Sequence, residues 1–192
     1  MKATIILVLC AAFAAPVFAE EPTTALLIID IQDFYFPGGK VPLVEPEAAS
    51  INAAKVLAAF RAAGNPVVHV RHEFEPGGSI HANVAPVEGE KVFTKTEVSC
   101  FNGTKVLAHL KEAGVDKLVI VGMQTHMCLE AATRAAHDLG FECVVVADAC
   151  ATRDLTYGER TVPAADVHAS TLATLNRTYA KVVVTEAFLS GN

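Results

Sequence analysis

The chain has 192 residues, of which 52% are hydrophobic and 19% are charged, and its formal net charge is −6. This length supports one domain with a sizeable core, and the apolar fraction excludes an intrinsically disordered chain. The sequence has no basic run or stripe, so it lacks the electrostatic footprint of nucleic-acid-binding proteins. We therefore expect a small-molecule substrate as the partner and no nucleic acid.

Residues 1–19 have the pattern of a secretory signal peptide. Lys2 supplies a positive start, residues 5–15 are apolar, and residues 17–19 follow the small-x-small cleavage rule. The apolar run is too short to cross a bilayer, which takes about 20 residues. We expect cleavage at that point, which leaves a mature domain over residues 20–192. This domain is expected in the periplasm or outside the cell, with no contact with the membrane after cleavage.

Four cysteines follow the signal peptide, namely Cys100, Cys128, Cys143 and Cys150. If residues 143–150 form a strand, Cys143 and Cys150 lie about 23 Å apart, because each step along a strand spans ~3.3 Å. A disulfide requires α-carbons within roughly 7 Å of each other. We expect no bond between these two, and four scattered cysteines in a chain with a large core do not have the pattern of a disulfide framework.

Strands and helices alternate along the mature chain. Residues 24–30 form a continuous apolar run that ends in Asp30, which is typical of a strand buried on both faces of a parallel sheet. We expect Asn102 to cap the second helix. The alternation predicts one α/β domain whose parallel sheet is covered by helices on both faces. Further strands are expected at residues 66–70, 91–95, 117–121, 142–147 and 181–185, and helices at residues 47–63, 102–113, 127–139 and 163–176.

Three reactive side chains fall at the carboxyl ends of predicted strands, where ligands bind in open parallel sheets. Asp30 ends the first strand, Lys95 ends the third, and Cys128 lies where the fourth strand turns into its helix. A helix N-terminus and a nearby ammonium both lower the pKa of a thiol, and a carboxylate in reach can take its proton. The pattern predicts an activated sulfur nucleophile, with backbone N–H groups of the same turn placed to hold an oxyanion.

Other catalytic signatures are absent from the sequence. It has no G-x-G-x-x-G, G-x-x-x-x-G-K-[ST], G-x-S-x-G or H-E-x-x-H motif, so dinucleotide redox, P-loop, serine-hydrolase and zincin chemistry lack their usual marks. Taken singly, a cysteine is also typical of a core, an aspartate of a turn and a lysine of a solvated surface. Spacing alone leaves both interpretations of the three residues open.

Three segments resemble the motif blocks of the isochorismatase-like cysteine hydrolases, a family that includes nicotinamidases and carbamoylsarcosine amidases. They are LIIDIQDF at residues 27–34, KTEVSCF at residues 95–101 and GMQTHMC at residues 122–128, and the resemblance extends over nearly the whole mature chain. The resemblance implies a three-layer α/β/α fold with a six-stranded parallel sheet of order 3-2-1-4-5-6. It also implies a homo-oligomer, and we expect no cofactor.

Carried over by matching position, the family's catalytic triad is Asp30, Lys95 and Cys128. The family has a non-proline cis peptide bond that would fall at Met123–Gln124, and its oxyanion hole would use the backbone N–H groups of Gln124 and Cys128. The implied activity is cleavage of a C–N bond in a small amide or ureido substrate. In this reaction the aspartate takes the thiol proton, the thiolate attacks the carbonyl, and the lysine supports the charges. The amine leaves to give a thioester, and water then hydrolyses the thioester to release the acid.

The sequence departs from the nicotinamidase pattern, which carries Asp-x-His after the second strand as part of a metal site. Residues 70–73 read Val-Arg-His-Glu instead. His69, His72 and His81 are close enough in sequence to consider a metal, but a polar loop with unrelated histidines is the interpretation adopted. We therefore expect no metal and no nicotinamidase activity.

Three residues are candidates for the wall of a substrate pocket, namely Phe34, His81 and His126. Phe34 is equally consistent with a core position, and His126 with a helix cap. Two rival functions remain. One is an isochorismatase-type vinyl-ether hydrolase, which needs no cysteine nucleophile, so that Cys128 favours C–N cleavage. The other is a non-catalytic binding protein that retains the fold.

Overall fold

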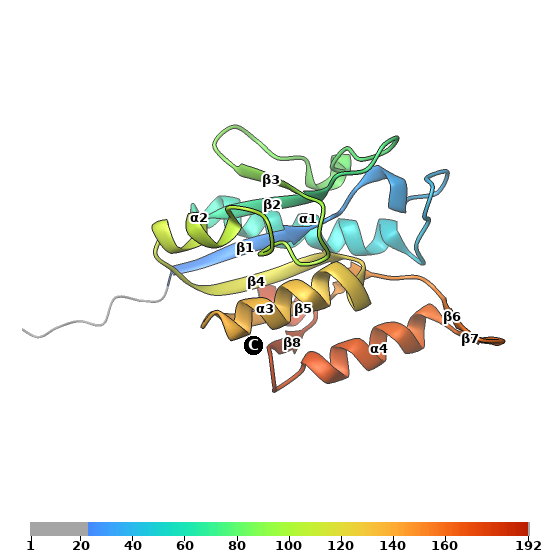
Figure 1. The fold of residues 1–192 in the computed structure, drawn as a ribbon. Coiled ribbons are helices and arrows are strands. Elements are labelled where there is room, and N and C mark those ends of the chain that lie inside the picture. The colour runs from blue at the N-terminus through green and yellow to red at the C-terminus, as the bar shows by residue number, and fades with distance from the viewer. Residues whose placement is uncertain (1–22, 192) are drawn as a thin grey trace, which may run out of the picture.

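A parallel sheet runs through the middle of the structure, a computed structural model that describes residues 23–191 (Figure 1). Its six strands have the order β3-β2-β1-β4-β5-β8, and every neighbouring pair is parallel. Because β8 is the sixth strand of this sheet along the chain, the predicted order 3-2-1-4-5-6 is confirmed. The strands are β1 (Thr23–Ile29), β2 (Val67–His72), β3 (Lys91–Lys95), β4 (Val115–Met123), β5 (Glu142–Ala151) and β8 (Lys181–Val183).

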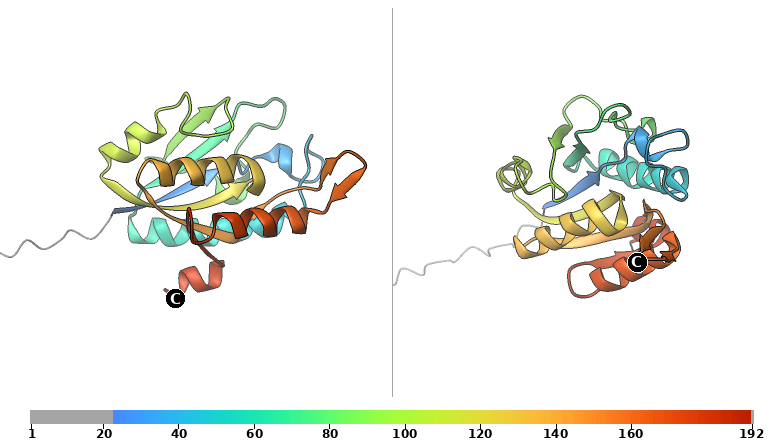
Figure 2. Two further views of the ribbon diagram at one scale, coloured as in Figure 1. Left: turned by 60° about the horizontal axis from the view of Figure 1, so that its bottom comes forward. Right: turned by 45° about the vertical axis from the view of Figure 1, so that its right-hand side comes forward.

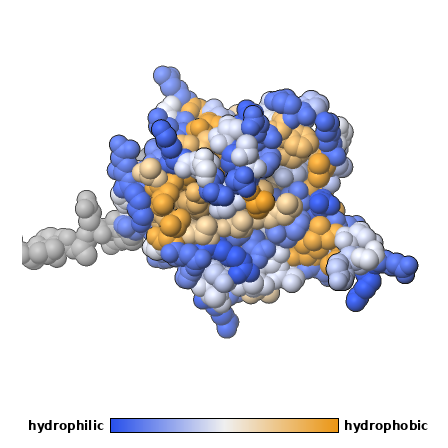
Figure 3. All heavy atoms as spheres, in the orientation of Figure 1, coloured by the Kyte–Doolittle hydropathy of each residue, from blue (hydrophilic) through white to orange (hydrophobic). Residues whose placement is uncertain are grey.

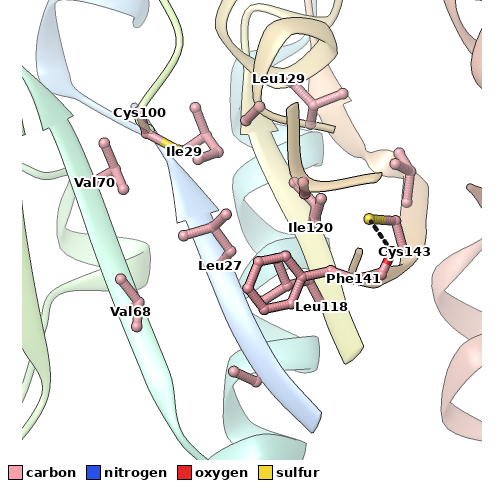
Figure 4. Close-up of a cluster of buried hydrophobic side chains, with 14 of the residues drawn as sticks. Leu27, Ile29, Val68, Val70, Cys100, Leu118, Ile120, Leu129, Phe141 and Cys143 are labelled. Atoms are coloured by element: carbon pink, nitrogen blue, oxygen red, sulfur yellow. Dashed lines mark hydrogen bonds between the residues drawn. The ribbon is translucent and has the colours of Figure 1, made fainter. Parts of the chain in front are cut away.

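Strand β1 shows why the central strands are continuously apolar. Successive side chains of a strand point to opposite faces of the sheet, so Leu27 and Ile29 enter one core cluster whereas Leu26 and Ile28 enter the other. Figure 4 shows Leu27 and Ile29 packed among side chains of β2 and β4 in the first cluster. Both faces are buried, and the three-layer α/β/α architecture follows.

The helices divide between the two faces of the sheet (Figures 1 and 2). α1 (Pro46–Ala63) and α5 (Thr185–Leu189) pack on one face, and α2 (Val106–Glu112), α3 (Glu130–Asp138) and α4 (Ala164–Leu175) pack on the other. On the side of the molecule shown in Figure 3, hydrophobic side chains gather around α2 and α3. Phe101 and Leu107 are partly buried and pack against the core. Each helix therefore buries one apolar side against the sheet.

The predicted start of the second helix is wrong. α2 begins at Val106, its cap position is Lys105, and Asn102 makes no capping bond. The reason is a turn before the helix: the Thr104 hydroxyl donates to the Cys100 carbonyl and accepts from the Val106 N–H. This turn satisfies the first helical N–H without an Asn102 cap.

Three elements near the C-terminus escaped the sequence analysis. β5 continues to Ala151, and a two-stranded antiparallel hairpin follows, formed by β6 (Leu155–Tyr157) and β7 (Arg160–Val162). The hairpin projects beyond the carboxyl end of the sheet (Figure 1). Its strands are short and mostly exposed, so they lack the apolar alternation by which strands are recognised. α5 is the third.

The cysteine and terminal predictions have different outcomes. Cys100, Cys128, Cys143 and Cys150 are all buried and free, and none of them forms a disulfide within residues 23–191. The predicted signal peptide at residues 1–19 lies outside the described residues. Among the helices of residues 23–191, none has both the length and the apolar character needed to cross a membrane.

Candidate active site

The carboxyl edge of the sheet brings together the three reactive side chains singled out in the sequence. Lys95 Nζ lies 2.8 Å from Asp30 Oδ2 and 3.2 Å from Cys128 Sγ. All three residues are buried, and Cys128 is 6% exposed. One ammonium group thus links a carboxylate and a thiol, and the three groups come from three different parts of the chain.

Asp30 takes its position from an unusual backbone conformation directly after β1. Its φ is 48°, in the left-handed region that non-glycine residues rarely adopt. Its N–H donates to the Val70 carbonyl of β2, so the neighbouring strand holds this conformation. Such strain, of order 1–3 kcal/mol, persists where the surrounding structure enforces it, and it concentrates at functional sites.

Cys128 lies in a π-helical turn, Thr125–Leu129, between β4 and α3. The peptide bond Met123–Gln124 just before this turn is cis, as the family resemblance implied. Gly122 precedes it, and a Cβ there would clash with the Ile29 carbonyl oxygen. Glycine therefore lets the end of β4 approach β1, which brings the turn with its sulfur beside Asp30.

The predicted lowering of the Cys128 pKa is wrong. Burial, together with the charge of the Asp30 carboxylate, raises the pKa of the Cys128 thiol to about 12, although Lys95 opposes the shift. Burial alone would lower the pKa of the Lys95 ammonium, but Asp30 and Cys128 raise it above its usual value. The resting site therefore holds a protonated thiol beside a charged lysine.

The carboxylate of this site is a stronger base than an ordinary aspartate. Burial raises the pKa of Asp30 above its usual value, and the opposing effect of Lys95 does not cancel the shift. A carboxylate of raised pKa accepts a thiol proton more readily. Burial thus raises the pKa of the proton acceptor as well as that of the thiol that donates the proton.

Two residues next to the catalytic turn were missed by the sequence analysis. Arg153 Nε donates to Gln124 Oε1 at 3.1 Å, and Gln124 Nε2 donates to the Tyr35 hydroxyl at 3.4 Å. Arg153 is the second residue after the end of β5, and the acidic and threonine residues around that strand end were the available signal. Tyr35 gave no signal, because it lies in a 3-10 helix of three residues (Asp33–Tyr35) that is too short to show a periodic pattern.

The three candidate pocket residues have different surroundings. Phe34 occupies a core position, where it stacks on Phe74 with ring centroids 4.2 Å apart, and its place in a pocket wall stays a prediction. His81 stacks on Phe36. His126 does not cap the helix: its Nδ1 lies 2.6 Å from the Thr152 hydroxyl, which fixes the turn to the end of β5.

No group of three or more His, Cys, Asp or Glu side chains within residues 23–191 is placed to hold a metal ion. The three histidines considered from sequence have separate partners. His69 Nε2 contacts Glu90, His72 Nδ1 contacts Lys95, and His81 stacks on an aromatic ring. They do not form one site.

A cavity of about 410 Å³ adjoins the catalytic turn between α1, the end of β5 and α4. Two of its lining residues contact the turn: Thr152 bonds His126, and His168 Nδ1 lies 2.9 Å from the Thr125 hydroxyl. None of the three catalytic candidates lines it. The cavity wall therefore contacts the turn through Thr125 and His126.

Comparison with known proteins places this arrangement in a family. Residues 24–187 match the family model of the isochorismatase domain. The chain belongs to the isochorismatase family of hydrolases. It is 47% identical over 178 residues to the isochorismatase family protein YddQ of Bacillus subtilis, covering 87% of this chain and 99% of that protein.

Two further relatives of this isochorismatase-family hydrolase are informative. A crystal structure from Oleispira antarctica, described as an isochorismatase hydrolase, superposes with a TM-score of 0.86 at 48% identity, covering 91% of this chain and all of that one. The maleamate amidohydrolase of Pseudomonas putida is 30% identical, covering 86% of this chain and 84% of that enzyme. The second of these is named for the hydrolysis of an amide.

Proposed function

We propose that this isochorismatase-family hydrolase cleaves a C–N bond of a small amide or ureido substrate through a thioester on Cys128. The observation that carries the proposal is the position of Lys95 Nζ between Asp30 Oδ2 and Cys128 Sγ. A nucleophile, a base and a fixed positive charge are then all in contact. The amidohydrolase relative supports C–N cleavage.

The resting protonation state sets the first step. Asp30 first accepts the thiol proton, so the negative charge passes from the carboxylate to a sulfur beside the same ammonium. The thiolate then attacks the substrate carbonyl, and the charge moves to the carbonyl oxygen. Because Lys95 touches both groups, the proton transfer creates no unpaired charge in the buried site. The burial and the raised pKa of the Cys128 thiol are therefore compatible with its attack on the substrate carbonyl.

The remaining steps use the same groups in reverse roles. Backbone N–H groups of Gln124 and Cys128 stabilise the tetrahedral oxyanion, and Asp30 returns its proton to the leaving amine. Water then enters, Asp30 accepts one of its protons, and the hydroxide attacks the thioester. The acid leaves, and the thiol regains its proton.

We propose further that the substrate carries an anionic group. Arg153 is half-buried next to Gln124, and none of the ion pairs among residues 23–191 involves it. Its Nε donates to Gln124, and a carboxylate is the ligand that best fits the rest of a guanidinium. The anionic group would then lie close to the Gln124 N–H that receives the carbonyl oxygen.

A panel of amides and ureido compounds, with and without a carboxylate, tests the proposed function by release of ammonia or amine. We expect release from at least one anionic member by the wild-type protein and none by Cys128→Ala. Cleavage of isochorismate that survives in Cys128→Ala would favour vinyl-ether hydrolysis. No release by the wild-type protein from any member would favour a binding protein.

Export and self-association are also proposed. Residues 1–19 support export, because their charge and apolar pattern is that of a signal peptide. Cell fractionation with N-terminal sequencing tests this, and a cytoplasmic chain that retains Lys2 would contradict it. Light scattering of the purified protein tests for the homo-oligomer, and the mass of a monomer would contradict it.

A further inference from the structure

Lys95 contacts more acceptors than the reaction needs. Its ammonium lies near Asp30 Oδ2 and Cys128 Sγ, and also 3.1 Å from His72 Nδ1 and 3.1 Å from the Glu97 carbonyl oxygen. An ammonium has three N–H donors for these four acceptors. His72 is therefore a competing partner of the group that links the carboxylate to the thiol.

The ring of His72 is placed by the sheet itself. His72 is the last residue of β2 and pairs in register with Lys95 of β3. Its N–H donates to Gln32 Oε1 at 2.7 Å, and its carbonyl accepts from Gln32 Nε2 at 2.9 Å. Gln32 is fully buried and follows Asp30 by two residues. The Gln32 side chain thus fixes the backbone of His72 between β1, which precedes Asp30, and β3, which ends in Lys95.

We propose that His72 is a positioning residue that acts through Lys95: its neutral imidazole accepts one ammonium N–H at Nδ1 and so keeps Nζ between Asp30 and Cys128. A ring that accepts at Nδ1 carries its proton on Nε2. The kinetic consequences rest on the proposed function, whereas the contact between ring and ammonium does not.

Protonation of His72 removes this contact. An imidazolium has no acceptor, and it would place a second cation 3.1 Å from the ammonium. The charged groups around the ring are Lys95 on β3, Asp30 after β1, Glu73 beside it and Glu97 in the following loop. Burial and Lys95 lower the pKa of His72 below 6.5, against the pull of the three acids.

The pH dependence follows with a definite sign. Above its pKa His72 is neutral and holds Lys95, and below its pKa it is charged and repels Lys95. We expect kcat to fall as the pH drops through a value below 6.5, while KM stays nearly unchanged because His72 acts through Lys95 rather than on substrate. A purely structural histidine would change the amount of folded protein and not the pH profile.

Two substitutions separate the roles of the ring. His72→Asn keeps an acceptor near the Nδ1 position that does not titrate, and His72→Leu removes the acceptor. For His72→Leu we expect kcat to fall about 10- to 100-fold, the scale of one hydrogen bond to a charged group. For His72→Asn we expect kcat to be close to that of the wild-type protein, and the fall of kcat at acidic pH that we assign to His72 to disappear. His137→Asn, on the exposed side of α3, is the matched control and should change neither.

A spectroscopic readout keeps this inference separate from the proposed function. Nitrogen-15 NMR of the histidine rings, with His72→Asn for assignment, should show His72 as the Nε2–H tautomer with a pKa below 6.5. An Nδ1–H tautomer would overturn the inference, as would unchanged kcat in folded His72→Leu or a fall of kcat at acidic pH retained in His72→Asn. If the wild-type protein cleaves no amide, the proposed function fails and the NMR result alone decides for or against the contact.

Discussion

Two clusters of charged side chains lie at opposite ends of β3, and the pKa values of their carboxylates are shifted in opposite directions. In the first, the Glu90 carboxylate accepts two N–H groups from Arg61, at 2.7 and 2.8 Å, and lies 2.9 Å from His69 Nε2. In the second, Asp30 faces Lys95 and the thiol of Cys128. The Glu90 cluster precedes β3, and the Asp30 cluster lies where β3 ends.

The number of hydrogen bonds to each carboxylate explains the contrast. Burial alone would raise the pKa of Glu90, but hydrogen bonds from Arg61, the Val87 N–H and His69 lower it to about 2. Burial raises the pKa of Asp30, and Lys95 does not offset it. A carboxylate that accepts several hydrogen bonds holds a loop in place. A carboxylate that accepts few of them keeps the basicity that proton transfer requires.

The largest expected effect in the comparison is on the sulfur. Cys128→Ala should reduce amide hydrolysis by at least about 10⁴-fold, because loss of a nucleophile removes the covalent route altogether. Steady-state rates on an active amide measure this. Cys143→Ala, which removes a buried thiol remote from Lys95, serves as the matched control, and an equal loss in both variants would contradict a special role for Cys128.

Asp30→Asn tests whether the Asp30 carboxylate is the general base that accepts the thiol proton. Asparagine tolerates the left-handed conformation found there, so the backbone is preserved. We expect kcat to fall about 10²- to 10⁴-fold, the range for general base catalysis. Rates are compared at a temperature where circular dichroism shows the variant folded, because Lys95 loses its buried partner. Near wild-type kcat would refute the assignment.

Glu90→Gln should have the opposite effect to Asp30→Asn: it should lower the free energy of unfolding and leave kcat unchanged. The folded-state pKa of Glu90 is about 2, below the ordinary value of 4.5. The stabilisation is therefore complete above pH 4.5 and disappears as the pH falls toward 2. Because Glu90 is only partly buried, solvent screening weakens its ion pair, and we expect a loss of about 1 kcal/mol.

Urea unfolding at several pH values measures the effect of Glu90→Gln. The wild-type protein should lose free energy of unfolding between pH 4.5 and 2, and the variant should show a flatter dependence over this window. Equal slopes would show that Glu90 does not supply the stabilisation.

Arg153→Leu has the smallest expected effect and sharpens the substrate side of the comparison. We expect KM for an anionic amide to rise about 10-fold or more, because one charge-assisted contact is lost. KM for a neutral amide of similar size should hardly change. The ratio of the two KM values is the measurement, and a parallel rise in both would count against an anionic substrate.

Apolar runs mark strand ends clearly, so the sequence placed Asp30, Lys95 and Cys128 at the carboxyl ends of strands. The strand order and the catalytic role of the three residues came from the resemblance of three motif blocks to a known family. The start of α2 could not be predicted, because the Thr104 turn competes with an Asn102 cap. The pKa of Cys128 could not either, since residue order does not show how deeply a thiol is buried. Arg153 was missed because its contact crosses to a residue 29 positions away.

Mass spectrometry of acid-quenched protein during turnover of an active amide addresses the central proposal most directly. The account predicts an added mass equal to the acyl part of the substrate, located on the peptide that contains Cys128. Turnover without any adduct there, together with full activity of Cys128→Ala, would contradict it.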